Sequence, residues 1–479
     1  MDSLKEKTAK GLLWSMFNNT TTQILNLLFG IYLARLLSPA DYGLVGVLTI
    51  FTTIAGNLQS CGFTQALTNM RQPTANDYNS VFWFNILTSI TIYVILFFSA
   101  PLIALYFRQS ALVELSRFVF LAFVISSFGI AHSAYMFKNM MVKQVTVIGV
   151  VALLLSGITG IVLAFRGKAY WSIAWQQVVY ITVLNIGRYY YTPWRPSLHI
   201  DFRPVKRMFR FSVKLLFTMI INTVSNNILT FIFGRLFPIH VVGNFTQAYK
   251  WNTMASSLLS GTVGQVAQPM LAEINDDKER ERRVFRKMMR FTAFLSFPAM
   301  FGLGMVSREF ILVTIHERWI HCVPLLRVLC VSGAFLPFYT MYQNLMISRG
   351  RSDIYLRCNI VQIVLQIALV IMFAHYGINT MVVAYTLFYI AFLAVWQHCL
   401  YKLTRISLLD TLKDLCPFML SAAAVMLVVY WLTRSLANLW LLLGVRIVLA
   451  AVLYAGIMKL ARVKMLDECI AFIRKKHVN

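Results

Sequence analysis

The sequence predicts an all-α integral membrane protein with about fourteen transmembrane helices. Of its 479 residues, 58% are hydrophobic and only 13% are charged, whereas soluble domains carry about 25% charged residues. The mean hydropathy is +0.67. So few charged side chains cannot cover a globule in water, and we therefore expect most of the exterior to face lipid.

The individual helices are predicted from runs of about 20 apolar residues, the length that crosses the hydrocarbon core of a bilayer. Nearly every residue from 11 to 460 falls in such a run or in a short connection, so no soluble domain is expected. No small-residue cleavage site follows the first run, which favours an uncleaved anchor. The predicted spans are 11–35, 42–66, 81–105, 115–136, 144–165, 169–191, 211–234, 241–270, 288–306, 325–347, 354–375, 378–400, 415–433 and 439–460.

The orientation is predicted from the distribution of the 44 Lys and Arg residues. Most of them lie in the N-terminal arm, in the connections 188–214 and 278–290, and in the tail from Lys459. Cytoplasmic connections are enriched in these residues, so we expect both termini in the cytoplasm and an even number of spans. The net charge of +26 then reflects contact with anionic lipid, and no nucleic-acid partner is expected.

An internal repeat divides the chain at an offset of 200 residues. The segment 34–43 reads ARLLSPADYG and the segment 234–243 reads GRLFPIHVVG, with Arg and the final Gly in register. Six spans separate the two copies, so both copies have the same orientation and form a parallel repeat. The predicted parts are a six-helix bundle at 1–191, a cytoplasmic linker at 192–210, a second six-helix bundle at 211–400, and two additional helices with a basic cytoplasmic tail at 401–479.

The first helix of each repeat carries a polar stripe with a spacing of four residues, which places its members on one helical face. Two interpretations stay open. The stripes hold neighbouring helices together by hydrogen bonds, or they line a hydrated cavity between the halves, because lipid offers polar groups no partner. The stripes consist of Asn18, Thr22 and Asn26 and of Thr218, Asn222 and Asn226.

Lys250 is the most informative charged residue, because it lies about 14 Å along its predicted span. A cation at that depth generally faces a water-filled path or an anion, and a diphosphate would suit it. A structural pair with a neighbouring helix is the alternative. Arg35 and Arg235 end their spans, where simple snorkelling competes with ligand binding. Arg446, near another span end, is expected to be a membrane anchor.

No catalytic residue, metal site or cofactor is predicted. The chain has no P-loop, its seven cysteines form no C-x-x-C pair, and its histidines are dispersed. Carboxylates near the spans are scarce and lie close to the span edges, so a coupling ion cannot be assigned. These carboxylates are Asp41, which is expected to cap the second helix, Glu114 and Glu309.

With these residues the chain resembles the polysaccharide-transporter branch of the multidrug/oligosaccharidyl-lipid/polysaccharide flippase superfamily, the Wzx-like proteins. The segment 35–43, RLLSPADYG, is the most specific match. Further matches are KTAKG at 7–11 with Trp14, GFTQAL at 62–67, GNF at 243–245 with Tyr249 and Lys250, Gln268 and Pro269, Arg318 and Trp319, PLLR at 324–327, and GRSD at 350–353.

The resemblance implies two six-helix bundles in a V, alternating access around a cationic cavity, and translocation of an isoprenoid-diphosphate-linked oligosaccharide. Such a flippase would move an O-antigen, capsule or exopolysaccharide unit to the outer face of a bacterial inner membrane, coupled to a proton or sodium gradient. Membrane lipids and a polysaccharide polymerase complex are the further expected partners. The expected cavity residues are Lys250, Arg35, Arg235, Asn18, Thr22, Asn26, Thr218, Asn222, Asn226 and Gln65.

Other functions remain to be separated from this one. A small-molecule or drug exporter of the same superfamily would need acidic residues in mid-membrane to bind cations, whereas this chain has a lysine there. A lipid II flippase is a nearer relative to exclude. The segment 35–43 favours the polysaccharide branch over it. A polymerase would typically have a large periplasmic loop, and the longest here, at about 307–324, is short.

Overall fold

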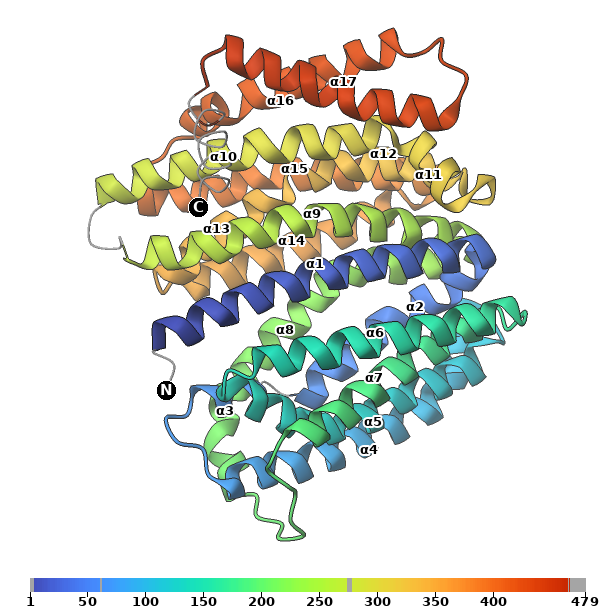
Figure 1. Ribbon diagram of the computed structural model, residues 1–479, viewed down its shortest axis with the longest axis vertical. Helices are drawn as coiled ribbons and strands as arrows, with labels where there is room; N and C mark the ends of the chain where they lie inside the picture. Colours follow the sequence, from blue (N-terminus) through green and yellow to red (C-terminus); the bar gives the residue numbers. More distant parts are fainter. Residues whose placement is uncertain (1–3, 61–62, 274–277, 464, 466–479) are drawn as a thin grey trace. The chain divides into compact units, whose positions relative to one another are not determined.

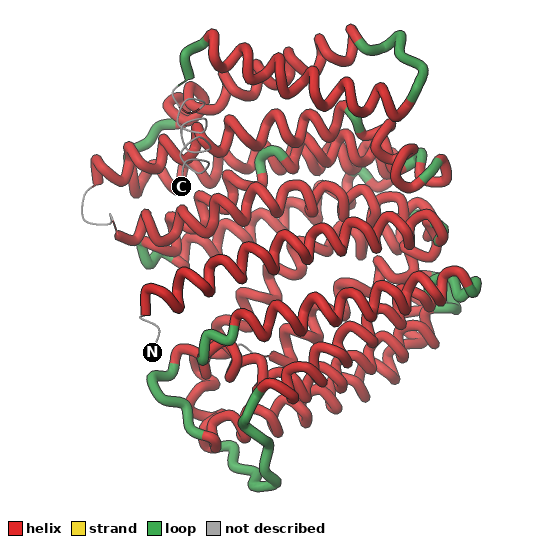
Figure 2. Tube along the Cα trace, viewed as in Figure 1, coloured by secondary structure: helices red, strands yellow, loops and turns green. Residues whose placement is uncertain are grey.

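The computed structural model describes residues 4–60, 63–273, 278–463 and 465. Within these ranges all regular structure is helical, with no strand (Figure 2). Most of the predicted basic tail, at 466–479, lies outside the described residues. The chain divides into two compact units, Met1–Gly243 and Asn244–Asn479. The division at 192–210 that the repeat suggests stays a prediction.

In the first unit the helices α4, α5, α6 and α7 lie side by side (Figure 1). The helix α5 packs against both α4 and α7, α6 packs against α1 and α7, and α8 packs against α2 and α4. The bounds are α1 Leu4–Leu36, α2 Pro39–Ser60, α3 Phe63–Asn69, α4 Ala75–Phe107, α5 Leu112–Lys138, α6 Val142–Phe165, α7 Trp171–Tyr191 and α8 Arg203–Leu236.

The second unit begins inside α9, whose first turn belongs to the first unit. Its helices α12 and α16 both pack against α10, α12 also packs against α15, and α17 packs against α16. The bounds are α9 Ile239–Glu273, α10 Lys278–Met305, α11 Ser307–Ile315, α12 Cys322–Gly333, α13 Leu336–Ser348, α14 Ser352–Met372, α15 Gly377–Thr404, α16 Leu408–Leu432 and α17 Leu439–Leu460, with short 3₁₀ turns at Glu317–Trp319 and Ala374–Tyr376.

Eleven helical segments of the described chain are long and apolar enough to cross a membrane, and each coincides with a predicted span. The other three predicted spans are also helical and correspond to α1, α7 and α9, with 33, 21 and 35 residues. They are richer in polar side chains; α7, for example, contains Gln176, Gln177, Asn185 and Arg188. The multi-pass helical membrane architecture is confirmed, whereas the count of fourteen stays a prediction.

Short polar motifs fix where several helices begin. Ser38 precedes α2, and its backbone N–H and hydroxyl both donate to Asp41 Oδ2, at 2.8 and 2.7 Å. Asp41 N–H donates back to Ser38 Oγ at 3.3 Å. This reciprocal capping box satisfies backbone donors that the first turn leaves free, and Pro39 at the first helical position lacks such a donor. Asp41 thus caps α2 as expected, but the helix begins at Pro39 and not at the expected Tyr42. Thr74 and Ser407 start α4 and α16 with the same motif.

The predicted span 325–347 is broken into α12 and α13. Pro337 lies in the first turn of α13 and has no N–H to donate to the preceding turn, which interrupts the helix. The break leaves the carbonyl of Ala334 available, and it accepts a hydrogen bond from Ser296 Oγ of α10 at 2.8 Å. A neighbouring hydroxyl therefore satisfies a backbone carbonyl at the break, as the interior of a membrane requires.

The connection between α7 and α8 lies against the start of α4. Ser197 N–H donates to Asn79 Oδ1 at 2.9 Å, and Trp83 Nε1 donates to the carbonyl of Ser197 at 2.7 Å. Asn76 donates to Asp201 at 3.1 Å. The Arg203 backbone N–H and the Asn76 amide hold the pKa of the Asp201 carboxyl below its usual value. The segment predicted as a linker is thus hydrogen-bonded to the first unit.

Two glycines bring the first turns of α2 and α9 into direct backbone contact. A Cβ on Gly43 would overlap the carbonyl oxygen of Ile239, and a Cβ on Gly243 would overlap the carbonyl oxygen of Pro39. Both pairs exchange under the offset of 200 residues found in the sequence, so the contact is reciprocal. Only glycine permits backbones to approach this closely.

Charged groups hold α16 and α17 against the other helices of the second unit. Asp414 of α16 is 5% exposed and accepts hydrogen bonds from Arg286 Nε and Arg290 Nε of α10, both at 2.6 Å. Arg446 of α17 and Glu309 of α11 form a buried ion pair of 2.9 Å, each side chain being 3% exposed. The expectation that Arg446 is a membrane anchor is therefore wrong, because its guanidinium lies inside the unit.

Substitution of either contact glycine should destabilise the protein. Gly43→Ala and Gly243→Ala should lower the unfolding temperature in detergent, because a methyl group would force the two backbones apart. Gly56→Ala in α2 and Gly261→Ala in α9 are the matched controls, since nothing lies within 4 Å of a Cβ at either position. These controls should be neutral or stabilising by up to about 1 kcal/mol through helix propensity. Equal unfolding temperatures for both pairs would contradict the contact.

Removal of one partner of the buried pair should cost more than removal of both. Glu309→Ala leaves the Arg446 charge buried, and such a loss costs about 3–5 kcal/mol. The double variant Glu309→Leu/Arg446→Leu should recover most of that stability, because no unpaired charge remains. Thermal unfolding of the purified variants measures this. A double variant no more stable than the single one would argue against the pair.

Candidate functional site

One polar face of α8 is used for packing inside the first unit. Asn57 of α2 donates its amide to Thr223 Oγ1 at 2.7 Å and to the carbonyl of Met219 at 3.4 Å. The amide of Asn227 donates to the carbonyl of Thr223 at 2.9 Å. Hydrogen bonds between helices therefore hold α2 on α8. The residues of α8 that form these bonds, 219, 223 and 227, each follow a member of the predicted stripe by one position.

The predicted stripes themselves are less buried. On α8, Thr218 and Asn222 are half-buried and each takes part in a contact, and Asn226 is exposed. On α1, Thr22 is half-buried and Asn26 is exposed. Asn18 lies in α1, but its side chain is outside the described part of the chain. The two equivalent asparagines, 26 and 226, thus share the same exposure, and the cavity interpretation stays a prediction.

The two equivalent arginines, Arg35 and Arg235, are exposed in the last turns of α1 and α8. Arg235 donates from Nη1 to the carbonyl of Tyr106 at 2.8 Å, and its guanidinium lies 5.4 Å from the ring centre of the same residue. A structural role at the end of α8 accounts for these contacts. Arg35 also has a partner within the described structure. Gln65 is exposed on the short helix α3.

Lys250 lies on α9 about 16 Å from the helix start at Ile239. The residue is half-buried and takes part in an interaction within the described structure. Next to it, Tyr249 stacks on Phe245 with ring centres 5.8 Å apart. Lys250 thus lies well inside a long helix, and its role as a partner of an anionic ligand stays a prediction.

Gln247 is a candidate site residue that the sequence interpretation missed. It lies one turn before Lys250 on α9 and is 0% exposed. Neither its amide nitrogen nor its amide oxygen has a hydrogen-bond partner among the described residues. A buried amide normally has partners, and an exception calls for a functional or structural explanation. The three-residue spacing to the mid-membrane lysine was the available sequence signal.

The second unit contains another buried polar face, on α14. Asn359, Gln362 and Gln366 have spacings of three and four residues and are all buried, so they share one side of the helix. Gln362 Oε1 accepts a hydrogen bond from Trp396 Nε1 at 3.3 Å. Asn359 Nδ2 and Gln366 Nε2 have no partner within the described ranges. Only part of this face is therefore explained by helix packing.

The three carboxylates near the spans have different environments. Asp41 is committed to the capping box of α2, Glu309 is paired with Arg446, and Glu114 is exposed in the first turn of α5. Across the described residues, no three His, Cys, Asp or Glu side chains gather as a metal-binding group.

Two glutamines in membrane helices should respond differently to the same substitution. Gln247→Leu should leave the unfolding temperature unchanged or raise it, because the buried amide loses no hydrogen bond. Gln59→Leu should lower it, because Gln59 donates to the carbonyl of Phe123 at 2.6 Å and accepts from Ser126 at 2.8 Å. Thermal unfolding in detergent compares the two. A destabilised Gln247→Leu protein would show that the amide has a structural partner.

The sequence is similar to proteins of polysaccharide biosynthesis. The model of the polysaccharide biosynthesis protein family matches residues 32–324. The chain is 27% identical over 76% of its length to an uncharacterized membrane protein in the cps region of Klebsiella pneumoniae, of which 76% is covered. It is 26% identical to the lipopolysaccharide biosynthesis protein WzxC of Escherichia coli, covering 75% of this chain and 73% of that protein. It is 24% identical to the teichuronic acid biosynthesis protein TuaB of Bacillus subtilis, covering 74% of each.

Two solved structures of membrane transporters have a similar fold. The lipid II flippase MurJ in an inward closed conformation superposes with a TM-score of 0.72 at 15% identity, covering 94% of this chain and 99% of that one. An inward-facing multidrug resistance MATE family transporter of the MOP superfamily gives 0.57 at 16% identity, with 81% and 96% covered. These likenesses establish the fold. Since the family model spans more than half of its length, the chain belongs to the polysaccharide biosynthesis protein family.

Proposed function

We propose that the chain is a flippase for isoprenoid-diphosphate-linked oligosaccharide and moves it from the cytoplasmic to the outer face of a bacterial inner membrane. The observation that carries the proposal is the position of Lys250 three residues after the buried, unpartnered amide of Gln247 within α9, in a chain of a polysaccharide biosynthesis family. The names of the relatives support it: WzxC belongs to lipopolysaccharide biosynthesis, TuaB to teichuronic acid biosynthesis and ExoT of Rhizobium meliloti to succinoglycan biosynthesis transport.

The cargo presents two chemically different groups to these residues. Its diphosphate is anionic, and an ammonium group in a medium of low dielectric binds an anion by strong charge-assisted hydrogen bonds. Its sugar hydroxyls both donate and accept, as amide side chains do. Lys250 therefore serves the diphosphate, and the amides of Gln247, Asn26 and Asn226 serve the sugar.

The lipid tail stays in the bilayer while the sugar crosses. Each polar group that met hydrocarbon without a partner would cost several kcal/mol, so the path needs a continuous supply of hydrogen-bonding groups. The polar stripes on α1 and α8 supply part of this path. Translocation needs no covalent step and no cofactor, and an ion gradient, of protons or sodium, supplies the energy.

The finer architecture of the proposal follows from the repeat. Fourteen spans form two six-helix bundles of the same orientation, arranged as a V and followed by two additional helices, and turnover proceeds by alternating access. The distribution of Lys and Arg supports cytoplasmic termini. The reciprocal contact at Gly43 and Gly243 supports the equivalence of the two halves. A polysaccharide polymerase is the proposed neighbouring protein.

A cation exporter of the same superfamily is the second candidate. Such a transporter needs a carboxylate available to its substrate, and here Asp41 and Glu309 are both committed to structural partners. A lipid II flippase shares the fold, but the similarity at 15% identity concerns the fold alone. The lysine in α9 and the family match both favour an oligosaccharide cargo.

Deletion of the gene in its source bacterium, with complementation by variants, tests the proposal. Lipid-linked repeat units should accumulate on the cytoplasmic face, as measured by labelling of each face in membrane vesicles. Lys250→Ala should lower translocation by about tenfold or more, because a hydrogen bond to a charged group contributes about 1.5–3 kcal/mol. Lys250→Arg should retain part of the activity.

Lys413→Ala is the matched control, because Lys413 is exposed on α16. It should translocate as the parent does. Full translocation by Lys250→Ala would remove that residue from the mechanism. A deletion strain with an unchanged distribution of repeat units would overturn the flippase function itself.

A further inference from the structure

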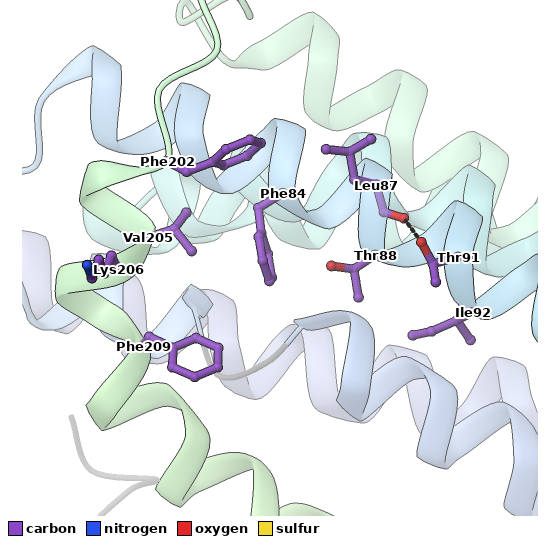
Figure 3. Close-up of a pocket in the computed structure, with 9 residues that line it drawn as sticks. All are labelled: Phe84, Leu87, Thr88, Thr91, Ile92, Phe202, Val205, Lys206 and Phe209. Atoms are coloured by element: carbon purple, nitrogen blue, oxygen red, sulfur yellow. Dashed lines mark hydrogen bonds between the residues drawn. The ribbon is translucent and has the colours of Figure 1, made fainter.

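The first unit has an apolar groove that the proposed path does not use. It lies between α4 and the first turns of α8 and has a volume of about 580 Å³ (Figure 3). From α4 the lining includes Phe84, Leu87 and Ile92, and from α8 it includes Val205 and Phe209. Thr91 also lines it, but its hydroxyl donates to the carbonyl of Leu87 at 2.9 Å. The hydroxyl of Thr91 is thereby satisfied within its own helix. Apart from Thr88, Thr91 and Lys206, the residues that line the groove are apolar.

One cation lies at the edge of this groove. Lys206 is the only charged residue of the lining, and it is exposed on α8 (Figure 3). The carboxylates nearby have other partners, because Asp77 pairs with Arg207 at 3.4 Å and Asp201 accepts from Asn76 and from the Arg203 backbone. In the described part of the chain, Lys206 forms no salt bridge. Its ammonium group is therefore available to a ligand.

The groove has the dimensions of one lipid chain within a leaflet. Phe84 and Ile92 are eight residues apart on α4, which corresponds to about 12 Å. Half of the hydrocarbon core is about 15 Å thick. Lys206 lies at the end of the groove near the start of α4, where Arg207 pairs with Asp77. The groove thus has a charged end, which matches a lipid headgroup, and an apolar surface beyond it, which matches an acyl chain.

We propose that this groove binds an anionic phospholipid of the surrounding bilayer, with one acyl chain along Phe84–Ile92 and the headgroup phosphate against Lys206. Attraction of a surface lysine to anionic lipid supplies the selectivity for the headgroup. Burial of the acyl chain supplies affinity that does not depend on the headgroup. The lipid would lie beside Phe202, at the end of the connection that is hydrogen-bonded to α4. The site is separate from the one proposed for the oligosaccharide.

Photocrosslinking in nanodiscs tests the site. The full chain is reconstituted with a trace of diazirine-labelled phosphatidylglycerol or diazirine-labelled phosphatidylcholine, and the crosslinked peptides are identified by mass spectrometry. Phosphatidylglycerol should label peptides of α4 and α8. Lys206→Glu should lower that labelling by about fivefold or more, the factor that corresponds to one lysine–lipid attraction. Leu87→Trp should lower the labelling by both lipids, because an indole fills the groove.

Lys143→Glu is the matched control: Lys143 is exposed at the start of α6 and does not line the groove. It should label as the parent does, and Lys206→Gln provides a milder variant if charge reversal prevents folding. Equal labelling by the two lipids, or labelling unaffected by Lys206→Glu and Lys206→Gln, would overturn the proposal. Displacement of phosphatidylglycerol by equimolar undecaprenyl phosphate would also overturn it, since the groove would then serve the cargo lipid. Loss of translocation activity plays no part in these outcomes, so the test is independent of the flippase function.

Discussion

The close backbone approach at Gly43 and Gly243 constrains how the first turns of α2 and α9 pack inside the first unit. Each glycine lies against the carbonyl of the residue four positions before the other. In a bilayer, helices gain little from burying apolar side chains against each other, because lipid tails are equally apolar. Close backbone contact and internal hydrogen bonds carry more of the specificity. The capping box of Ser38 and Asp41 fixes the turn that presents one of these surfaces.

The polar groups of the spans divide into two classes. Gln59, Asn57 and Ser296 have protein partners on neighbouring helices, and they hold the fold together. Gln247, on α9, has no such partner in the described structure. A buried amide without a hydrogen-bond partner lowers stability, and such exceptions to the usual rule are typical of binding sites.

Much of the fold was predictable from the sequence, because hydrophobic length and the repeat are local patterns. All the predicted spans are helical, and Asp41 was expected to cap a helix beginning at Tyr42, whereas α2 begins at Pro39 and Asp41 caps it from within the first turn. The pairing of Arg446 with Glu309 was not predictable, since the two residues are far apart in sequence and meet only after packing. The stripe on α8 was placed one residue away from the face that bonds Asn57, because spacing alone does not tell which face meets a neighbour. The site residues proposed from the sequence rest on depth and charge alone.

The buried pair between α11 and α17 has a consequence for biogenesis. An arginine near the middle of a span makes insertion of that span unfavourable by about 2.5–3.5 kcal/mol. Arg446 lies seven residues after the start of the 22-residue α17, further into the span than the sequence interpretation assumed, and carries part of this cost. Its counter-ion, Glu309 of the short helix α11, is synthesised first, so an acceptor for the guanidinium is already present when α17 leaves the ribosome. The order of synthesis thus suits the order in which the two charges must meet, and integration of the final span depends on the helices made before it.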